Sequence, residues 1–385
     1  MPSVSSSAAS TLSNNGRFDT LTPQQQEKLK QMWSVLLAAM EIAEPQAPAA
    51  SPQFNPKPLV PKLLNLMSSK EIRLVLWNLS RTMTIDNMLL RFLRARQFDV
   101  PKSVEMLGKT LHWRLKESGL DELQFRGEIG ALKSNDVDFL SQLRSKKAYI
   151  HGKDKNGRPV VRVTPRLHSK DKQSPQCIEK FTLHLFESTL LMLDEKVDTI
   201  VFLFDMTGFS LFNMDYAYVK YILKCFENYY PESLGILLIH NAPWVFSGVW
   251  NIIKGWIDPN VAQKIKFTKN VQALQEYIEI DQIPEDLGGK DTFKYEYPEP
   301  RSSEGDKLQD HAGREEALNE RSALCQQLEQ NTIDWVQCSA SSEQEVLDIR
   351  RDLTNKLKAQ YWTLDCYVRA PCVCDRLGQI HPVMA

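Results

Sequence analysis

Two apolar segments decide the fold of this chain: Val197-Asp-Thr-Ile-Val-Phe-Leu-Phe-Asp205 and Leu234-Gly-Ile-Leu-Leu-Ile-His240. Both carry apolar residues at successive positions, as strands do when they are buried on both faces. Segments of helical periodicity lie beside them, over 179–193 and 216–229. Strands that alternate with helices of 10–15 residues indicate a largely parallel sheet covered by helices. The sequence therefore predicts an α/β lobe here.

A hairpin opens this predicted sheet. Lys155-Asn-Gly-Arg-Pro159 is a turn sequence between the apolar segments 148–150 and 160–163. The chain before it shows only helical periodicity, with one helix expected to begin at Asp86 as its cap and another over 99–119. We therefore expect an all-helical N-terminal lobe ahead of the α/β lobe.

Composition divides the chain into five regions. Residues 1–20 are rich in Ser, Ala and Asn and are expected to be disordered. Residues 21–60 read as a helix followed by a proline-rich linker, 61–130 as a helical domain, and 131–290 as the sheet domain. Residues 291–385 form an acidic, helical extension, with 11 Lys and Arg against 17 Asp and Glu.

The composition is that of a globular protein, with 42% hydrophobic and 25% charged residues. A formal net charge of −1 gives no indication of nucleic-acid binding. The seven cysteines form no C-x-x-C pair, which favours a reducing compartment. No basic-then-apolar leader opens the chain, and no apolar stretch is long enough to span a membrane. We therefore expect a cytoplasmic protein whose contact with intracellular membranes is peripheral.

Motifs of common enzyme classes are absent from the sequence. There is no G-x-G-x-x-G after a strand, and Gly289-Lys290 lacks both the earlier glycine and the following Ser or Thr of a phosphate loop. His240, at a strand end, is expected to be a hydrogen-bonded core residue. Cys372-Val-Cys374 has no complementary cluster that would complete a metal site. The sequence thus predicts no catalytic residues, no metal and no cofactor.

A Trp-rich segment over 244–258 is apolar almost all the way round. Its helical periodicity gives one apolar stripe at positions 245, 249, 252 and 256, and a second at 246, 250, 253 and 257. The segment is too short to span a membrane, which takes about 20 residues. One stripe is expected to contact the protein, and the other either more core or lipid.

Several motifs together resemble those of CRAL-TRIO lipid-binding proteins, over about residues 60–290. They are Leu89-Leu-Arg-Phe-Leu-Arg-Ala-Arg96, His112-Trp-Arg114, Asp154-Lys-Asn-Gly-Arg-Pro159, Phe204-Asp-Met-Thr-Gly208, Asn228-Tyr-Tyr-Pro-Glu232, Asn241-Ala-Pro-Trp244 and Ile283-Pro-Glu-Asp-Leu-Gly-Gly289. Arg166-Leu-His168, Asn213-Met-Asp-Tyr216 and the aromatic C-terminal tail are similar to fungal homologues of the yeast phosphatidylinositol transfer protein.

The resemblance implies a non-enzymatic protein that holds one lipid in an internal pocket. The sheet would form the pocket floor, through Ile200, Phe202, Phe204 and Leu238. A gate helix would close the pocket, through Trp244, Val245, Phe246, Val249, Trp250, Ile253 and Trp256.

The resemblance also implies where the headgroup of the lipid would bind. Arg96 and Lys264 would contact the phosphate, and Glu232 would accept from inositol hydroxyls or orient the lysine. Two positions depart from the family pattern, because Gln97 stands where a second basic residue is usual and Val261 where a hydroxyl residue is usual.

Strand residues bear on which lipid is held. The family's binders of choline lipids place hydroxyls where this chain has Ile200 and Phe202, so a phosphatidylcholine headgroup would lack those partners. Phosphatidylinositol is therefore the expected ligand. Two alternatives stay open: a carrier for a sterol-like or squalene-like neutral lipid, and an adaptor that binds a protein partner through its acidic C-terminal extension.

Overall fold

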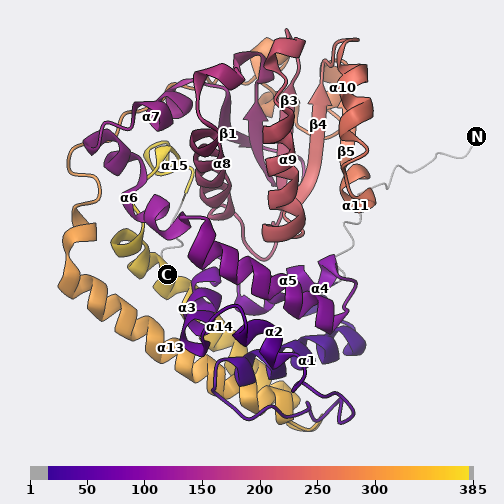
Figure 1. The fold of residues 1–385 in the computed structure, drawn as a ribbon, viewed down its shortest axis with the longest axis vertical. Helices are drawn as coiled ribbons and strands as arrows, with labels where there is room; N and C mark the ends of the chain where they lie inside the picture. The colour runs from indigo at the N-terminus through magenta and orange to yellow at the C-terminus, as the bar shows by residue number, and fades with distance from the viewer. Residues whose placement is uncertain (1–15, 381–385) are drawn as a thin grey trace, which may run out of the picture.

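The computed structural model describes residues 16–380. The chain forms a helical lobe and a sheet-containing lobe, and a long helical hairpin runs along the helical lobe (Figure 1). The predicted disorder is wrong for residues 16–20, because Phe18–Thr20 forms a 3-10 turn and Arg17 pairs with Asp198 at 2.7 Å. Residues 1–15 lie outside the described part of the chain.

The N-terminal region is helical, as predicted. Its helices are α1 (Pro23–Ala39), α2 (Val60–Leu64), α3 (Ser69–Leu79), α4 (Ile85–Ala95), α5 (Val100–His112), α6 (Leu120–Lys133) and α7 (Val137–Arg144), with a π turn at Trp113–Glu117. Thr22 and Ser68 cap α1 and α3 through capping boxes. The expected cap of α4 is wrong: Thr84 caps this helix, and Asp86 is buried in the core.

The sheet has the order β1-β2-β3-β4-β5, with β1 antiparallel to β2 and the other pairs parallel. Its strands are β1 (Ala148–Lys153), β2 (Pro159–Val163), β3 (Ile200–Asp205), β4 (Leu234–His240) and β5 (Ile265–Thr268). The predicted hairpin joins β1 to β2, with Gly157 at φ +78° in its turn. Strand β5 escaped the sequence analysis because it is only four residues long and half of it is exposed.

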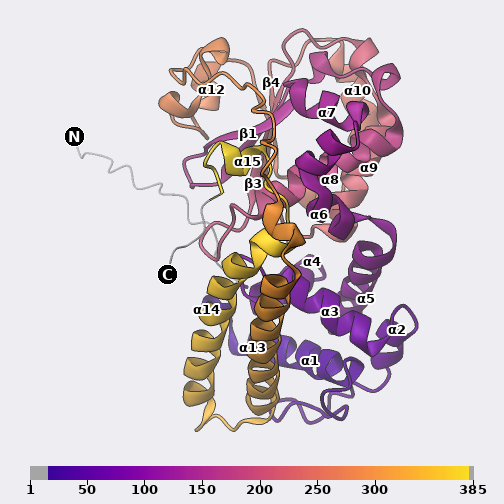
Figure 2. The ribbon, with the colours of Figure 1, turned by 90° about the vertical axis from the view of Figure 1, so that its left-hand side faces the viewer.

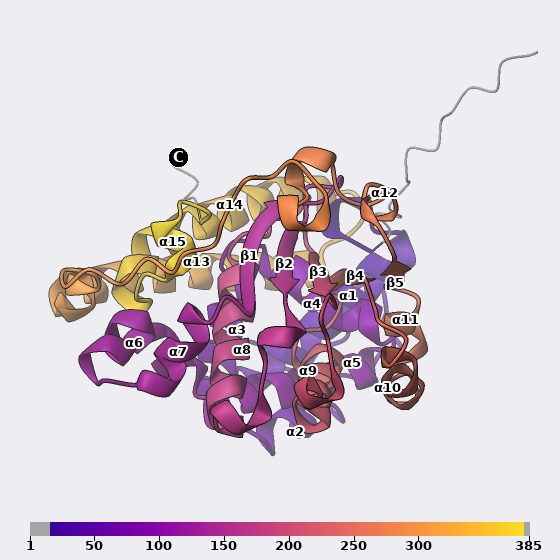
Figure 3. The ribbon, with the colours of Figure 1, turned by 90° about the horizontal axis from the view of Figure 1, so that it is seen from above.

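Helices cover one face of the sheet, and shorter elements cover the other. The helical face carries α8 (Pro175–Leu190), α9 (Tyr216–Lys224) with a π turn at Cys225–Tyr229, α10 (Phe246–Ile253) and α11 (Pro259–Ala262). The opposite face packs against α12 (Val271–Leu274), against Ile278 and Ile283 on either side of the 3-10 turn Ile280–Gln282, and against the 3-10 turn Glu285–Leu287. Seen from above, α8 and α9 lie on one side of the strands and α12 on the other (Figure 3).

The C-terminal region is not a detached extension. After the 3-10 turn Asp306–Gln309, helices α13 (His311–Gln337) and α14 (Glu343–Val368) form a hairpin against the N-terminal helices (Figure 2). Leu328, Trp335 and Leu357 of this hairpin belong to the same hydrophobic core as α1, α3, α4 and α5. The short helix α15 (Val373–Arg376) returns to the sheet-containing lobe.

The proline-rich segment expected to be a linker is packed onto this hairpin. Ser51 is buried and donates a hydrogen bond to Glu27, and the Ala49 N–H donates to the Val336 carbonyl at 3.1 Å. Nearby, Lys30 of α1 pairs with Glu343 of α14. The N-terminal and C-terminal regions therefore form one folded unit with the helical lobe.

Candidate functional site

An apolar cavity lies between the helical face of the sheet and helices α8, α9 and α10. Its volume is about 200 Å³, and its wall is made mostly of aliphatic and aromatic side chains. Phe202 and Phe204 of β3 and Leu237 and Ile239 of β4 form the floor. An adaptor whose pocket is only a folding core would have this space filled, so the structure does not favour that alternative.

Two of the four residues predicted to form the pocket floor line the cavity. Phe202 and Phe204 line the cavity, while Ile200 has the same orientation but packs in the core beside it. Leu238 points to the opposite face, where it packs against Leu203. The sequence cannot give this orientation, because all positions from 236 to 239 are apolar. Phe202 pairs with Leu237, so both side chains face the cavity. Leu238 faces away, because side chains alternate along a strand.

One of the two predicted apolar stripes of α10 faces the cavity. Phe246, Trp250, Ile253 and Ile257 line the cavity. The regular helix is shorter than expected, since α10 runs only from Phe246 to Ile253. A turn containing Gly255, a residue of low helix propensity, follows it, and α11 begins after that turn.

The other predicted stripe does not form a second continuous face. Val249 is buried against Met206 and Ile239, whereas Ile252 is 47% exposed. Val245 precedes the helix, and Trp256 follows it and packs edge-on against Tyr216 at 5.8 Å.

A small exposed apolar surface lies beside α10. Trp244 precedes α10 and is 88% exposed, and Phe212 in the 3-10 turn Leu211–Asn213 is 91% exposed. The loops that carry them follow β4 and β3, and Asn241 Nδ2 joins these loops by donating to Thr207 Oγ1 at 3.2 Å. The two aromatic side chains therefore lie at the same edge of the sheet.

Arg96, Glu232 and Lys264 line one polar pocket of about 420 Å³. Lys264 Nζ lies 3.5 Å from Glu232 Oε2, and both side chains are about one-third exposed. Arg96 ends α4, whereas Glu232 and Lys264 precede β4 and β5. The structure thus brings together three predicted residues that are far apart in the sequence.

The polar pocket adjoins the apolar cavity directly. Phe226, Leu234, Ile257 and Val261 line both. An amphiphile can therefore place its charged head beside Arg96 and Lys264 and its chains over the sheet. Val261, which stands where a hydroxyl is usual, makes the boundary between the two spaces apolar.

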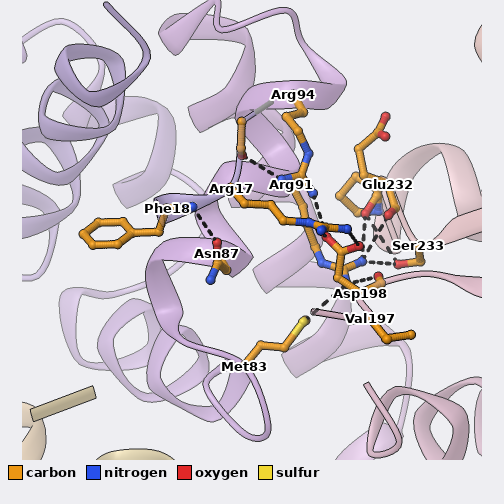
Figure 4. A network of polar contacts seen from close by, with 12 residues as sticks. Arg17, Phe18, Met83, Asn87, Arg91, Arg94, Val197, Asp198, Glu232 and Ser233 are labelled. Atoms are coloured by element: carbon orange, nitrogen blue, oxygen red, sulfur yellow. Dashed lines mark hydrogen bonds and ion pairs between the residues drawn. The ribbon is translucent and has the colours of Figure 1, made fainter. Parts of the chain in front are cut away.

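A buried arginine, Arg91, contacts the turn that carries Glu232, and the sequence analysis did not predict this role. Arg91 of α4 donates hydrogen bonds to the Asp198 carbonyl, to the Glu232 carbonyl at 3.3 Å and to Ser233 Oγ at 2.8 Å (Figure 4). Burial lowers the pKa of Arg91 to about 10. Glu232 has φ +53°, which is unfavourable for a residue with a Cβ. Arg91 therefore holds in place the strained turn that presents Glu232.

The Asp198 carboxylate completes this network. Arg17 approaches it at 2.7 Å and Arg94 at 3.4 Å. Burial raises the pKa of Asp198, but the charges of Arg91, Arg17 and Arg94 together hold it below its usual value. One signal for Arg91 was available, since a charged residue between Leu90 and Phe92 interrupts the apolar face of α4.

His240 is buried and its Nδ1 lies 2.9 Å from Thr268 Oγ1, which confirms it as a hydrogen-bonded core histidine. Within residues 16–380, no group of three or more His, Cys, Asp and Glu side chains is placed to hold a metal ion. No helix in the same range is long and apolar enough to cross a membrane.

Comparisons with known proteins agree with this architecture. The CRAL/TRIO domain model matches residues 143–289, and the CRAL/TRIO N-terminal domain model matches residues 56–109. A CRAL-TRIO domain-containing protein of Schizosaccharomyces pombe is 40% identical over 84% of this chain and 72% of its own length. Phosphatidylinositol transfer protein CSR1 of Eremothecium gossypii is 40% identical over 83% of this chain and 74% of its own. The Sec14 cytosolic factor of Schizosaccharomyces pombe is 29% identical over 57% and 79% respectively.

Proposed function

Because this chain belongs to the CRAL-TRIO family, we propose that it binds a single phosphatidylinositol molecule and exchanges or presents it at membranes without catalysing a reaction. The observation that carries this proposal is the shared wall between a polar pocket and an apolar cavity. The phosphoinositol group occupies the polar pocket, and the acyl chains occupy the cavity over β3 and β4.

The headgroup contacts follow from the charges. Lys264 and Arg96 donate charge-assisted hydrogen bonds to the phosphate, which displaces Lys264 from its pairing at 3.5 Å with Glu232. Glu232 then accepts hydrogen bonds from inositol hydroxyls. Phosphatidylcholine has no such hydroxyls, and Phe202 offers its headgroup no hydrogen bond on the floor of the cavity.

Exchange requires the gate to move. Transfer of a chain of about 16 methylenes from bilayer to water costs on the order of 13 kcal/mol, at ~0.8 kcal/mol per methylene. The chains must therefore pass straight from cavity to bilayer while α10 is displaced. Exposed Trp244 and Phe212, beside α10, provide the peripheral membrane contact. Such a carrier works from the cytoplasm, and a protein partner of the C-terminal hairpin stays a prediction.

The test is transfer of labelled phosphatidylinositol between vesicles. Glu232→Ala combined with Lys264→Ala should abolish transfer and leave the melting temperature within a few degrees, because partly exposed charges contribute little to stability. The matched control removes another exposed ion pair, Lys155 with Glu279 at 3.8 Å, and should transfer normally. Unchanged transfer by the first double variant refutes the assignment.

A further inference from the structure

The apolar cavity has a second polar end. Lys147 precedes β1 and His168 follows β2, so both lie at the edge of the sheet where β2, β3 and β4 end. Glu232 and Lys264 lie at the other edge, where β4 and β5 begin. Both Lys147 and His168 line the cavity, although they are only 6% and 9% exposed.

Lys147 is a buried cation without an acidic partner. Its Nζ donates to Gln142 Oε1 and lies 5.7 Å from the centre of the Phe181 ring. No carboxylate within residues 16–380 forms an ion pair with it, and burial lowers the pKa of Lys147 to about 8. A buried charge without a counter-charge is costly, so an anion that enters the cavity gains a partner here.

His168 supplies a second buried nitrogen at this end of the cavity. Its Nε2 is buried and makes no hydrogen bond in the described structure, although Asp215 Oδ2 lies 3.5 Å away. The ring stacks on Tyr218 with centroids 5.5 Å apart, which fixes its orientation. Burial and the positive charge of Lys147 lower the pKa of His168, and Asp215 opposes this shift. Lys147, His168 and Asp215 all line this part of the cavity, and Lys147 is the group there that has no counter-charge among the described residues.

We propose that this end of the cavity is a subsite for the carboxylate of a long-chain fatty acid, held by Lys147 Nζ and His168 Nε2. Two donors match the two oxygens of a carboxylate. The acyl chain then lies over Phe202, Phe204 and Leu237 in the space that the chains of a phospholipid would use. The fatty acid therefore lies in the opposite direction to phosphatidylinositol, with its charged group at the other end of the cavity. The two ligands compete because their chains occupy the same space.

The test is equilibrium dialysis of the full chain with radiolabelled oleate, methyl oleate and oleyl alcohol at pH 7. Oleate should bind at least about tenfold more tightly than the ester or the alcohol, since only oleate neutralises the lysine. Lys147→Met should remove this preference, and Lys146→Met, at the exposed neighbouring position, should keep it. His168→Phe keeps an aromatic ring stacked on Tyr218. It should weaken the binding of oleate and leave the binding of methyl oleate and oleyl alcohol unchanged.

Several outcomes overturn the proposal: no oleate binding, equal binding of oleate and methyl oleate, or a preference that survives Lys147→Met. Oleyl alcohol binding as tightly as oleate identifies a site for a neutral hydroxyl instead. Glu232→Ala with Lys264→Ala should leave oleate affinity unchanged, because those residues lie at the other end of the cavity. Failure of the headgroup assignment can therefore be distinguished from failure of this subsite.

Discussion

Arg350→Met tests whether the C-terminal hairpin is part of the fold. Arg350 of α14 is 1% exposed, and its Nε and Nη2 each donate to the Asp86 carboxylate of α4 at 2.7 Å. Asp86 also accepts from Trp33 Nε1 at 2.7 Å, and the guanidinium lies 4.8 Å from the centre of the Trp335 ring. The substitution leaves the Asp86 carboxylate buried without its counter-charge.

The expected loss is large. Removing one partner of a buried ion pair costs about 3–5 kcal/mol, because the other charge remains desolvated. At roughly 2 °C per kcal/mol for a chain of this size, the melting temperature should fall by about 6–10 °C. Adding Asp86→Asn removes the stranded charge and should restore part of this loss.

Thermal and urea denaturation, followed by circular dichroism, measure the effect. The control is Arg351→Met, because Arg351 is the next residue and forms an exposed pair with Asp348 at 2.9 Å. Its change should stay within about 0.5 kcal/mol. If Arg350→Met destabilises no more than Arg351→Met, the hairpin is a dispensable extension and the shared core described above is wrong.

Three further predictions concern the cavity and its surroundings. Arg91→Met should reduce phosphatidylinositol transfer more than tenfold although Arg91 does not line the headgroup pocket, and full transfer by a folded variant would contradict its positioning role. Trp244→Ser with Phe212→Ser should weaken vesicle binding in a flotation assay without lowering the melting temperature, whereas Leu74→Ser, at an exposed site on α3, should not affect it. Lys147→Met should raise the free energy of unfolding at pH 7 by up to about 3 kcal/mol. The lysine pKa of about 8 in the folded state lies below the ordinary 10.5, so this gain should shrink between pH 8 and 10.5, which a series of urea denaturations would show.

The three predicted headgroup residues illustrate what a sequence pattern can provide. Arg96, Glu232 and Lys264 were placed by resemblance, and the structure brings them to one pocket. For Glu232 the motif that carries it also leads into the predicted strand β4, whereas Lys264 precedes β5, which the sequence did not predict, so its position was expected from the resemblance alone. In the structure Glu232 stands two residues before β4 and Lys264 one residue before β5, and positions that precede neighbouring parallel strands meet at one edge of a sheet.

The sequence by itself determined the local elements: the turn between β1 and β2, the apolar strands β3 and β4, and the apolar stripe of α10. These depend on periodicity and turn chemistry, which act over a few residues. Tertiary structure alone decided that Leu237, not Leu238, faces the cavity, because strand register fixes that choice. It also decided the pairing of Asp86 with Arg350 across 264 residues. Segments far away in the sequence bury Asp86 and Arg350 and so determine what these side chains do. A local sequence pattern does not contain this information.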